Sequence, residues 1–226
     1  VTQPSMEPLA REEEIQFIID NIKIYLARDP ERSDVLAIFS GLRPLVKGNA
    51  SNTAALSRDH YIEVSESGLI SITGGKWTTY RKMAEDAVNT AIQQLGLDQR
   101  PCITAELPIH GAMEVPNYSD HGYYYGTDWA KIQILMKQAP ELAETIHPNL
   151  TYTKAEIIWA VREEMCMTVE DALSRRTRAL LLNAGAAITA ATGVAQLIAK
   201  EKNYDRQWEQ EQVDHFCSIA ANYLAK

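Results

Sequence analysis

Hydrophobic residues recur at helical spacing in two stretches of the first hundred positions. Isoleucines at 15, 18, 19 and 22 form one face of a predicted helix that begins near Glu12 and ends before Pro30. A longer helix is predicted over residues 80–95, where one apolar stripe runs along the helix and Gly96 provides the carboxy-terminal cap.

Shorter apolar runs between these helices predict strands. The continuous run from Val35 to Phe39 is typical of a strand that is buried on both faces. Residues 61–64 and 69–73 predict two paired strands, with a hairpin turn at 65–68. Residues 1–97 are therefore expected to form a mixed αβ segment.

The pattern changes after Gly96. Residues 98–125 contain several prolines and glycines and few periodic apolar positions, so they predict an extended linker. Beyond the linker the sequence predicts helices with short connections. Two of these helices cover 128–138 and 140–146, and the last covers 204–224. Between them, one helix begins at the capping box of Thr153 and Glu156, another at Thr168, and a neutral one at about residue 186. The predicted fold class is thus α+β and mostly α, with an all-α helical domain over 98–226.

Composition excludes several classes of protein. The net charge of −8 argues against a nucleic-acid partner, because phosphate backbones are held by clustered Lys and Arg. The cysteines at 102, 166 and 217 are too scattered for a disulfide framework or a zinc site and fit a reducing compartment. The histidines also lack metal-ligand spacing, so no metal site is predicted. The uncharged stretch 179–199 is as long as a membrane span, but its alanines and polar residues favour a buried helix of a bundle.

The clearest chemical signal is the sequence Ile-Thr-Gly-Gly-Lys-Trp-Thr-Thr-Tyr-Arg at 72–81, where a strand leads into a glycine pair and a helix start. Glycines allow close backbone approach, threonine hydroxyls can cap the helix, and the helix amino terminus favours negative charge. Lys76 and Arg81 add cations that suit phosphate. Taken alone, a tight turn with surface charges explains the stretch equally well.

Two upstream arginines strengthen the interpretation as an anion site. Arg43 lies in Ser-Gly-Leu-Arg-Pro-Leu and Arg58 in Ser-Arg-Asp, each near the end of a predicted strand. We expect both to converge with Lys76 at one sheet edge. These motifs, together with Cys102-Ile-Thr, Tyr125-Gly and the segment 168–178, resemble the late half of FAD-dependent glycerol-3-phosphate dehydrogenase. This is the aerobic, quinone-linked type in the D-amino-acid-oxidase-like flavoprotein superfamily.

The resemblance implies a division of labour along the chain. Residues 1–97 would be the αβ remnant of a FAD and substrate-binding domain, and residues 98–226 a carboxy-terminal helical domain. Arg43 and Arg58 would bind the substrate phosphate, and Lys76 the substrate or the pyrimidine edge of the flavin. The residues expected around the flavin ring are Gly74, Gly75, Lys76, Trp77, Thr78 and Thr79. No catalytic base is expected in this chain: His60 opens a strand, and the resemblance places the base upstream.

The implied reaction oxidises glycerol 3-phosphate to dihydroxyacetone phosphate by hydride transfer to FAD, with a membrane quinone as electron acceptor. This implies a cytoplasmic protein, with peripheral attachment to the inner face of the cell membrane and a homodimer left open. One rival is a glycerol-3-phosphate oxidase that passes electrons to oxygen. Another is a non-catalytic helical interaction module.

Two further expectations concern the extent of the chain and its second cationic cluster. No Gly-x-Gly-x-x-Gly spacing occurs and the sequence begins at Val1, so we expect the carboxy-terminal portion of a longer flavoenzyme, inactive alone. Arg175, Arg176 and Arg178 are expected to pair with nearby carboxylates. The alternative is docking onto the flavin domain or onto acidic lipid head groups.

Overall fold

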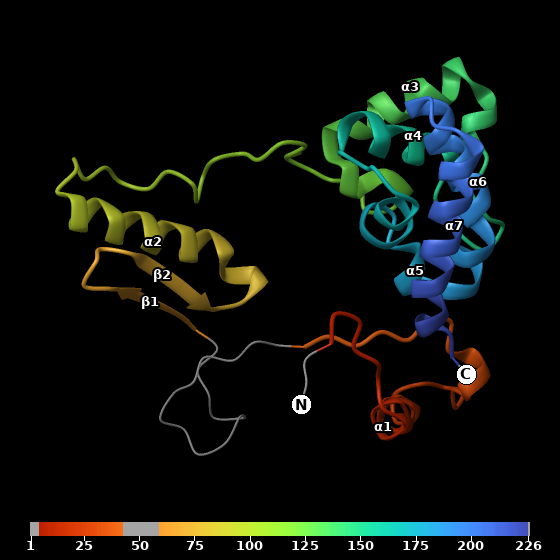
Figure 1. Ribbon diagram of the computed structural model, residues 1–226, viewed down its shortest axis with the longest axis horizontal. Coiled ribbons are helices and arrows are strands. Elements are labelled where there is room, and N and C mark those ends of the chain that lie inside the picture. The colour runs from red at the N-terminus through yellow and green to blue at the C-terminus, as the bar shows by residue number, and fades with distance from the viewer. Residues whose placement is uncertain (1–4, 43–58, 226) are drawn as a thin grey trace. The chain divides into compact units, whose positions relative to one another are not determined.

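The computed structural model describes residues 5–42 and 59–225, which group into two units (Figure 1). The larger unit contains the described residues up to Gly41 together with those from Gly111 onward. The smaller unit contains those between Leu42 and His110. Helices predominate and the sheet is small, which confirms the predicted α+β, mostly α class.

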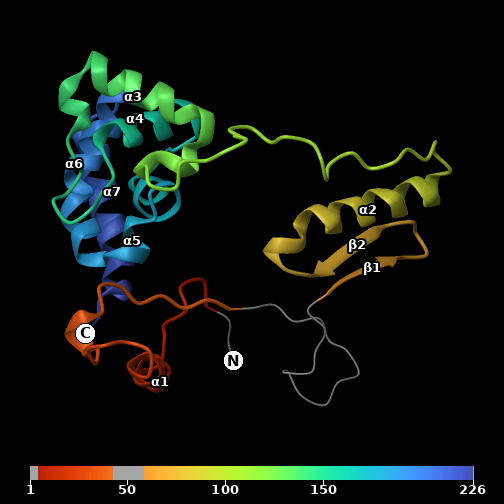
Figure 2. The same ribbon diagram turned by 180° about the vertical axis from the view of Figure 1, so that it is seen from behind.

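The smaller unit is a β-hairpin with one helix beside it. Strands β1 (His60–Val64) and β2 (Ile70–Gly74) pair antiparallel, with His60 opposite Gly74 and Val64 opposite Ile70. Both views show helix α2 (Tyr80–Leu95) lying along one face of this hairpin (Figures 1 and 2). The two paired strands and the long helix were both predicted, and both are confirmed.

Helix α2 ends where the sequence indicates. Gly96 takes the left-handed conformation, with φ of +61°, and the N–H of Leu97 donates to the carbonyl of Ile92 at 3.0 Å. A residue with a Cβ adopts this conformation only with strain, so glycine is the natural stop. Residues 98–120 then form only turns and extended chain, before a 3₁₀ segment over His121–Asp128.

The larger unit is a helical bundle, in agreement with the predicted all-helical part. Its helices are α3 (Trp129–Gln138), α4 (Lys154–Glu163), α5 (Ala179–Leu182), α6 (Ala184–Lys202) and α7 (Arg206–Ala220). Helix α6 packs along α7 and also against α4 and α5. Phe216, Ile157 and Leu173 are fully buried in this core, so apolar burial holds the bundle together.

The uncharged stretch is buried, as predicted, but it is broken once. Asn183 separates α5 from α6, and its side chain accepts a hydrogen bond from the N–H of Ala186 at 3.0 Å. The alanines of α6 that face the core, such as Ala187, Ala191 and Ala195, let the neighbouring helices approach closely. Among the helices of the described ranges, none is long and apolar enough to cross a membrane.

One predicted strand is wrong. Residues 35–39 are extended but belong to no sheet, and the side chains of Leu36 and Phe39 are largely exposed. Their backbone groups bond to the helical bundle instead: the N–H of Ile38 donates to the carbonyl of Tyr223 at 2.8 Å, and the carbonyl of Leu36 accepts from Ala184 at 3.0 Å. These bonds take the place of a strand ladder.

The same bonds explain why the units differ from the predicted division at residue 97. Helix α1 (Glu12–Lys23) and the extended segment after it group with the bundle and not with the hairpin. The Tyr223 hydroxyl also donates to Glu7 at 3.4 Å, so the end of the chain holds the amino-terminal segment. Such contacts join residues about two hundred positions apart, which local sequence patterns do not encode.

Candidate anion-binding turn

The turn between β2 and α2 is built on two glycines in the left-handed region. Gly74 and Gly75 both have φ of +78°, a conformation that strains any residue with a Cβ. A short 3₁₀ turn at Trp77–Thr79 then leads directly into α2. The predicted order of strand, glycine turn and helix start is therefore present.

Thr79 closes this turn. Its hydroxyl accepts from the N–H of Lys76 at 3.2 Å and donates to the Lys76 carbonyl at 3.0 Å. The N–H of Thr79 also donates to that carbonyl at 3.0 Å. Both Thr78 and Thr79 are exposed, but the Thr79 hydroxyl is engaged in hydrogen bonds within the turn.

Of the two cations predicted at this turn, Lys76 and Arg81, only Lys76 is without an ion pair among the described residues. Lys76 is exposed and makes no ion pair with a carboxylate in the part of the chain that the structure describes. Arg81, in contrast, donates to Glu85 at 2.8 Å and to Thr104 at 3.2 Å. Lys76 is therefore the described residue that can offer an uncompensated positive charge to a ligand at this turn.

The remaining members of the predicted site are placed only in part. Trp77 is 85% exposed and stacks on Tyr80, with 5.5 Å between ring centroids. Arg43 and Arg58 lie outside the described residues, so their convergence with Lys76 stays a prediction. Of the predicted site, the structure describes only the continuous stretch from Gly74 to Thr79.

Three residues beneath the turn were not predicted as part of the site. A Cβ on Gly75 would collide with Sδ of Met83 and lie 3.4 Å from Cβ of His60. His60 Nε2 lies 3.0 Å from Asp86 Oδ2. The pKa of Asp86 lies below its ordinary value, mainly because of the hydrogen bond from Lys82 and to a smaller extent because of the contact with His60. Met83 counts in the sequence only as one position of an apolar stripe, and nothing local links Asp86 to His60.

A second polar cluster, in the larger unit, surrounds the fully buried Glu156. Its carboxylate accepts from the Thr153 N–H at 2.7 Å, from the Tyr124 hydroxyl at 2.8 Å and from the Tyr125 hydroxyl at 3.2 Å, and His121 Nε2 lies 3.2 Å away. Burial, with the Glu156 charge next, raises the pKa of Tyr124 and of Tyr125, so both hydroxyls remain donors at neutral pH. The sequence predicted the Thr153 and Glu156 capping box, which is confirmed, but not the three aromatic partners.

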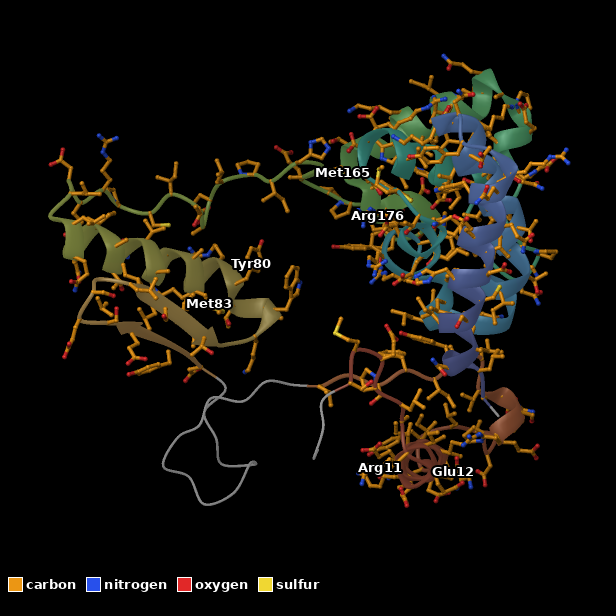
Figure 3. The ribbon with its side chains drawn as sticks, in the orientation of Figure 1. Arg11, Glu12, Tyr80, Met83, Met165 and Arg176 are labelled. Carbon is orange, nitrogen blue, oxygen red and sulfur yellow. The ribbon has the colours of Figure 1, made fainter. Side chains whose placement is uncertain are left out.

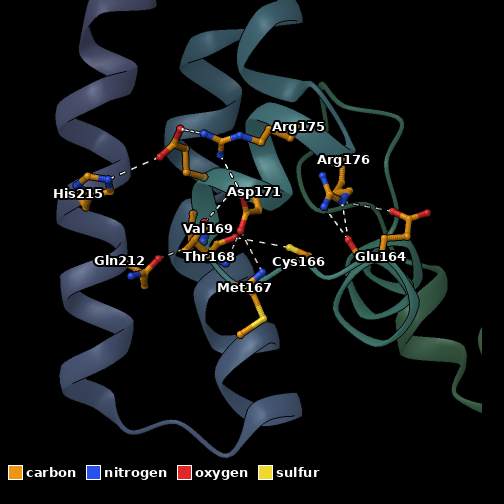
Figure 4. Close-up of polar contacts among 11 residues, drawn as sticks. Glu164, Cys166, Met167, Thr168, Val169, Asp171, Arg175, Arg176, Gln212 and His215 are labelled. Atoms are coloured by element: carbon orange, nitrogen blue, oxygen red, sulfur yellow. Dashed lines mark hydrogen bonds and ion pairs between the residues drawn. The ribbon is translucent and has the colours of Figure 1, made fainter. Parts of the chain in front are cut away.

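Two members of the arginine cluster, Arg175 and Arg176, make structural contacts, as expected from their carboxylate neighbours (Figure 4), whereas no carboxylate among the described residues forms an ion pair with Arg178. Arg175 pairs with Glu170 at 2.6 Å and with Asp171 at 3.1 Å. Arg176 donates through Nε and an Nη atom to the Glu164 carbonyl, at 2.9 and 2.6 Å. Within the described residues, no group of His, Cys, Asp and Glu is arranged to hold a metal ion.

Part of the larger unit matches a known protein family. Residues 122–209 match the model of a family described as the C-terminal domain of alpha-glycerophosphate oxidase. This part of the chain is similar to such a domain. The match begins within the 3₁₀ segment at His121–Asp128 and extends into α7, so it covers most of the bundle.

Curated relatives extend the similarity to almost the whole chain. Mitochondrial glycerol-3-phosphate dehydrogenase from Homo sapiens is 36% identical over 236 residues, which cover 94% of this chain and 32% of the human protein. The Arabidopsis thaliana enzyme of the same name is 31% identical, over 91% of this chain and 38% of its own length. The chain thus spans about a third of the length of the curated relatives it matches. The resemblance drawn from the motifs is confirmed.

A solved structure shows the same fold. The glycerol-3-phosphate dehydrogenase from Bacillus halodurans, determined in complex with FAD, matches with a TM-score of 0.73 and 23% identity. The match covers 96% of this chain and 46% of the Bacillus chain.

Proposed function

We propose that this chain is the carboxy-terminal portion of an FAD-dependent glycerol-3-phosphate dehydrogenase. The whole protein would oxidise glycerol 3-phosphate to dihydroxyacetone phosphate and pass the electrons to a quinone. The observation that carries the proposal is the similarity to glycerol-3-phosphate dehydrogenases over 94% of the chain, which includes the glycine turn. In this proposal the hairpin unit contributes to the FAD and substrate site, and the bundle has a structural or partner-contact role.

The turn has the chemistry that such a site needs. A small dianion requires a cation, and the exposed Lys76 supplies one without a competing carboxylate among the described residues. The N–H groups at the start of α2 add partial positive charge. The left-handed glycines keep bulky side chains away from the backbone of the turn. These features also fit the polar edge of a flavin.

The residues of this chain would bind and orient. FAD, when bound, supplies the hydride acceptor. Lys76 would hold either the substrate or the pyrimidine edge of the flavin, and Thr79 would keep the Lys76 backbone in place. Arg43 and Arg58 would neutralise the substrate phosphate and so orient C2. The general base is proposed to lie outside this chain, which alone would then be inactive.

Substitution of Lys76 tests the proposal. In the full-length protein, Lys76→Ala should lower kcat/KM for glycerol 3-phosphate roughly 100-fold, because the cation that holds the substrate or the flavin edge is lost. Lys137→Ala, which removes an exposed lysine of α3, serves as the control and should leave the rate unchanged. Steady-state assays with a dye acceptor measure both. Unchanged turnover in Lys76→Ala would favour the non-catalytic interaction module.

An oxygen-using oxidase is the second candidate, because the family that matches the bundle is described by an oxidase. The two candidates differ in the electron acceptor and not in the substrate. Assays of the full-length protein for peroxide formation in air, and for reduction of a soluble quinone without oxygen, separate them. We favour the quinone, since the curated relatives are named as dehydrogenases.

The proposed location is the inner face of the cell membrane, where a quinone is accessible to a peripheral cytoplasmic protein. A homodimer remains part of the proposal as an open alternative. Flotation of the full-length protein with vesicles, and light scattering in solution, test these two points directly.

A further inference from the structure

The glycine turn is supported from below by α2. Met83 lies one helical turn beyond the start of α2, and Figure 3 labels it at the side of α2 that faces β2. An added Cβ on Gly75 would collide with Met83 Sδ and would lie 2.8 Å from its Cε. Because Gly75 has no side chain, the backbone of the turn can pack directly on the Met83 thioether. The Met83 side chain therefore sets the distance between the turn and α2.

A second contact ties the same corner together. His60, the first residue of β1, lies opposite Gly74 in the strand register. Its Nε2 is 3.0 Å from Asp86 Oδ2, and Lys82 Nζ lies 2.8 Å from the other Asp86 oxygen. The side chains of His60 and Asp86 are only 20% and 30% exposed. The pair therefore connects the strand beside the turn to the second turn of α2.

Together these contacts restrain the turn in two directions. Met83 limits its approach to the helix, and the His60–Asp86 pair limits sliding of β1 and β2 along the helix. Lys76 follows the turn directly, so its position depends on both restraints.

We infer that Met83 and the His60–Asp86 pair are positioning residues, which hold the Gly74–Gly75 turn and Lys76 in place for the bound anion. The inference rests on the proposed function, because it concerns the same site. None of the three residues needs to touch the substrate.

The test compares matched variants in the full-length flavoprotein. Met83→Ala removes the support, Met83→Leu keeps most of its volume, and Gln94→Ala removes a polar side chain of similar length from an exposed position of α2. His60→Ala and His60→Gln form a second pair, since glutamine can still donate to Asp86. Each variant is measured for flavin content, thermal midpoint, KM and kcat for glycerol 3-phosphate, and the reduction potential of the bound flavin.

A positioning role predicts a specific pattern. Met83→Ala and His60→Ala should raise KM roughly tenfold or more and shift the flavin potential, because small displacements of binding groups have large kinetic effects. Met83→Leu and His60→Gln should restore most of both values, and Gln94→Ala should leave both unchanged. Alanine variants that lower only the thermal midpoint, with wild-type KM and potential, would overturn the inference.

A double-mutant cycle checks the contact itself. Gly75→Ala is expected to raise KM for two reasons, the strained backbone conformation and the collision with Met83. When Met83 is also alanine the collision is gone, so Gly75→Ala should raise KM by a smaller factor. Additive losses would contradict the inference. If the wild-type protein failed to oxidise glycerol 3-phosphate, the proposed function would fail instead. Hydrogen exchange of residues 74–80, compared between wild type and Met83→Ala, would then still test whether Met83 restrains the turn.

Discussion

The carboxylate of Glu156 is shielded from solvent, and its hydrogen-bond donors come from the protein. Thr153, Tyr124 and Tyr125 all donate to it, and its side chain has no exposed area. The donors supply the hydrogen bonds that water would make to an exposed carboxylate. This residue therefore fixes the 3₁₀ segment at His121–Asp128 onto the start of α4.

Replacement of Glu156 by glutamine should be costly although the shape is unchanged. The amide nitrogen would face N–H and O–H donors, which would leave buried groups without partners. We expect Glu156→Gln to lower the free energy of unfolding of the bundle by about 3 kcal/mol. Glu163→Gln, at an exposed position near the end of the same helix, should cost little. Urea denaturation followed by circular dichroism measures both, and equal stabilities would contradict the role given to Glu156.

The Glu156 cluster also marks the limit of prediction at the residue scale. Thr153 and Glu156 are three positions apart, so the capping box could be predicted. Tyr124 and His121 come from more than thirty positions upstream, and no periodicity connects them to Glu156. The Gly-Gly-Lys turn was predictable for the same local reason, whereas the support from Met83 and Asp86 was not.

Helices and strands show the same contrast between local patterns, which the sequence reveals, and distant contacts, which it does not. Apolar spacing and Gly96 defined α2 closely, because both signals act within the helix itself. The apolar run at 35–39 predicted a strand, but apolar residues give the same pattern in a strand and in an extended segment that crosses a bundle. Hydrogen bonds to Tyr223 and Ala184 decided between them. These partners lie far along the chain.

The element that follows α4 depends on one ionised side chain. Asp171 begins a π-helical segment (Asp171–Arg176), accepts from the N–H groups of Met167 and Thr168 at 3.1 Å each, and pairs with Arg175. Burial by itself would raise the pKa of Asp171, but these donors outweigh it and the net pKa is lowered. The anion therefore stabilises the folded state.

This lowered pKa predicts a pH-dependent effect of Asp171→Asn. A carboxyl with a lower pKa in the folded state stabilises the fold fully above its unfolded pKa of about 4, and progressively less as the pH falls below that value. At pH 7 the variant should be less stable by about 1 kcal/mol, because hydrogen bonds to a charged acceptor stabilise more than those to a neutral one. At pH 3 the gap should narrow. Urea midpoints of both proteins at the two pH values test this, and a gap that widens in acid would contradict it.

At the scale of the whole molecule, burial is unevenly distributed. The larger unit encloses a continuous apolar core, in which Phe216, Leu173 and Ile198 have no exposed area. In the smaller unit, none of the described residues from 59 to 110 is buried, and apolar side chains such as Leu69 and Val88 are more than half exposed. With no buried residue among those described, the smaller unit gains little apolar burial to offset its loss of conformational entropy.

The two units should therefore differ in stability in the 226-residue chain. Backbone amides of α4, α6 and α7 should exchange with deuterium only through global unfolding of the bundle, whereas those of β1, β2 and α2 should exchange through much smaller openings. Hydrogen exchange with mass spectrometry measures both on one sample, so differences in pH or temperature cannot produce the contrast. In a full-length flavoprotein, amides of α2 should become slow, because the additional chain would cover its exposed apolar side chains. Equal protection of α2 and α6 in the 226-residue chain would mean that the hairpin unit is stable without such cover.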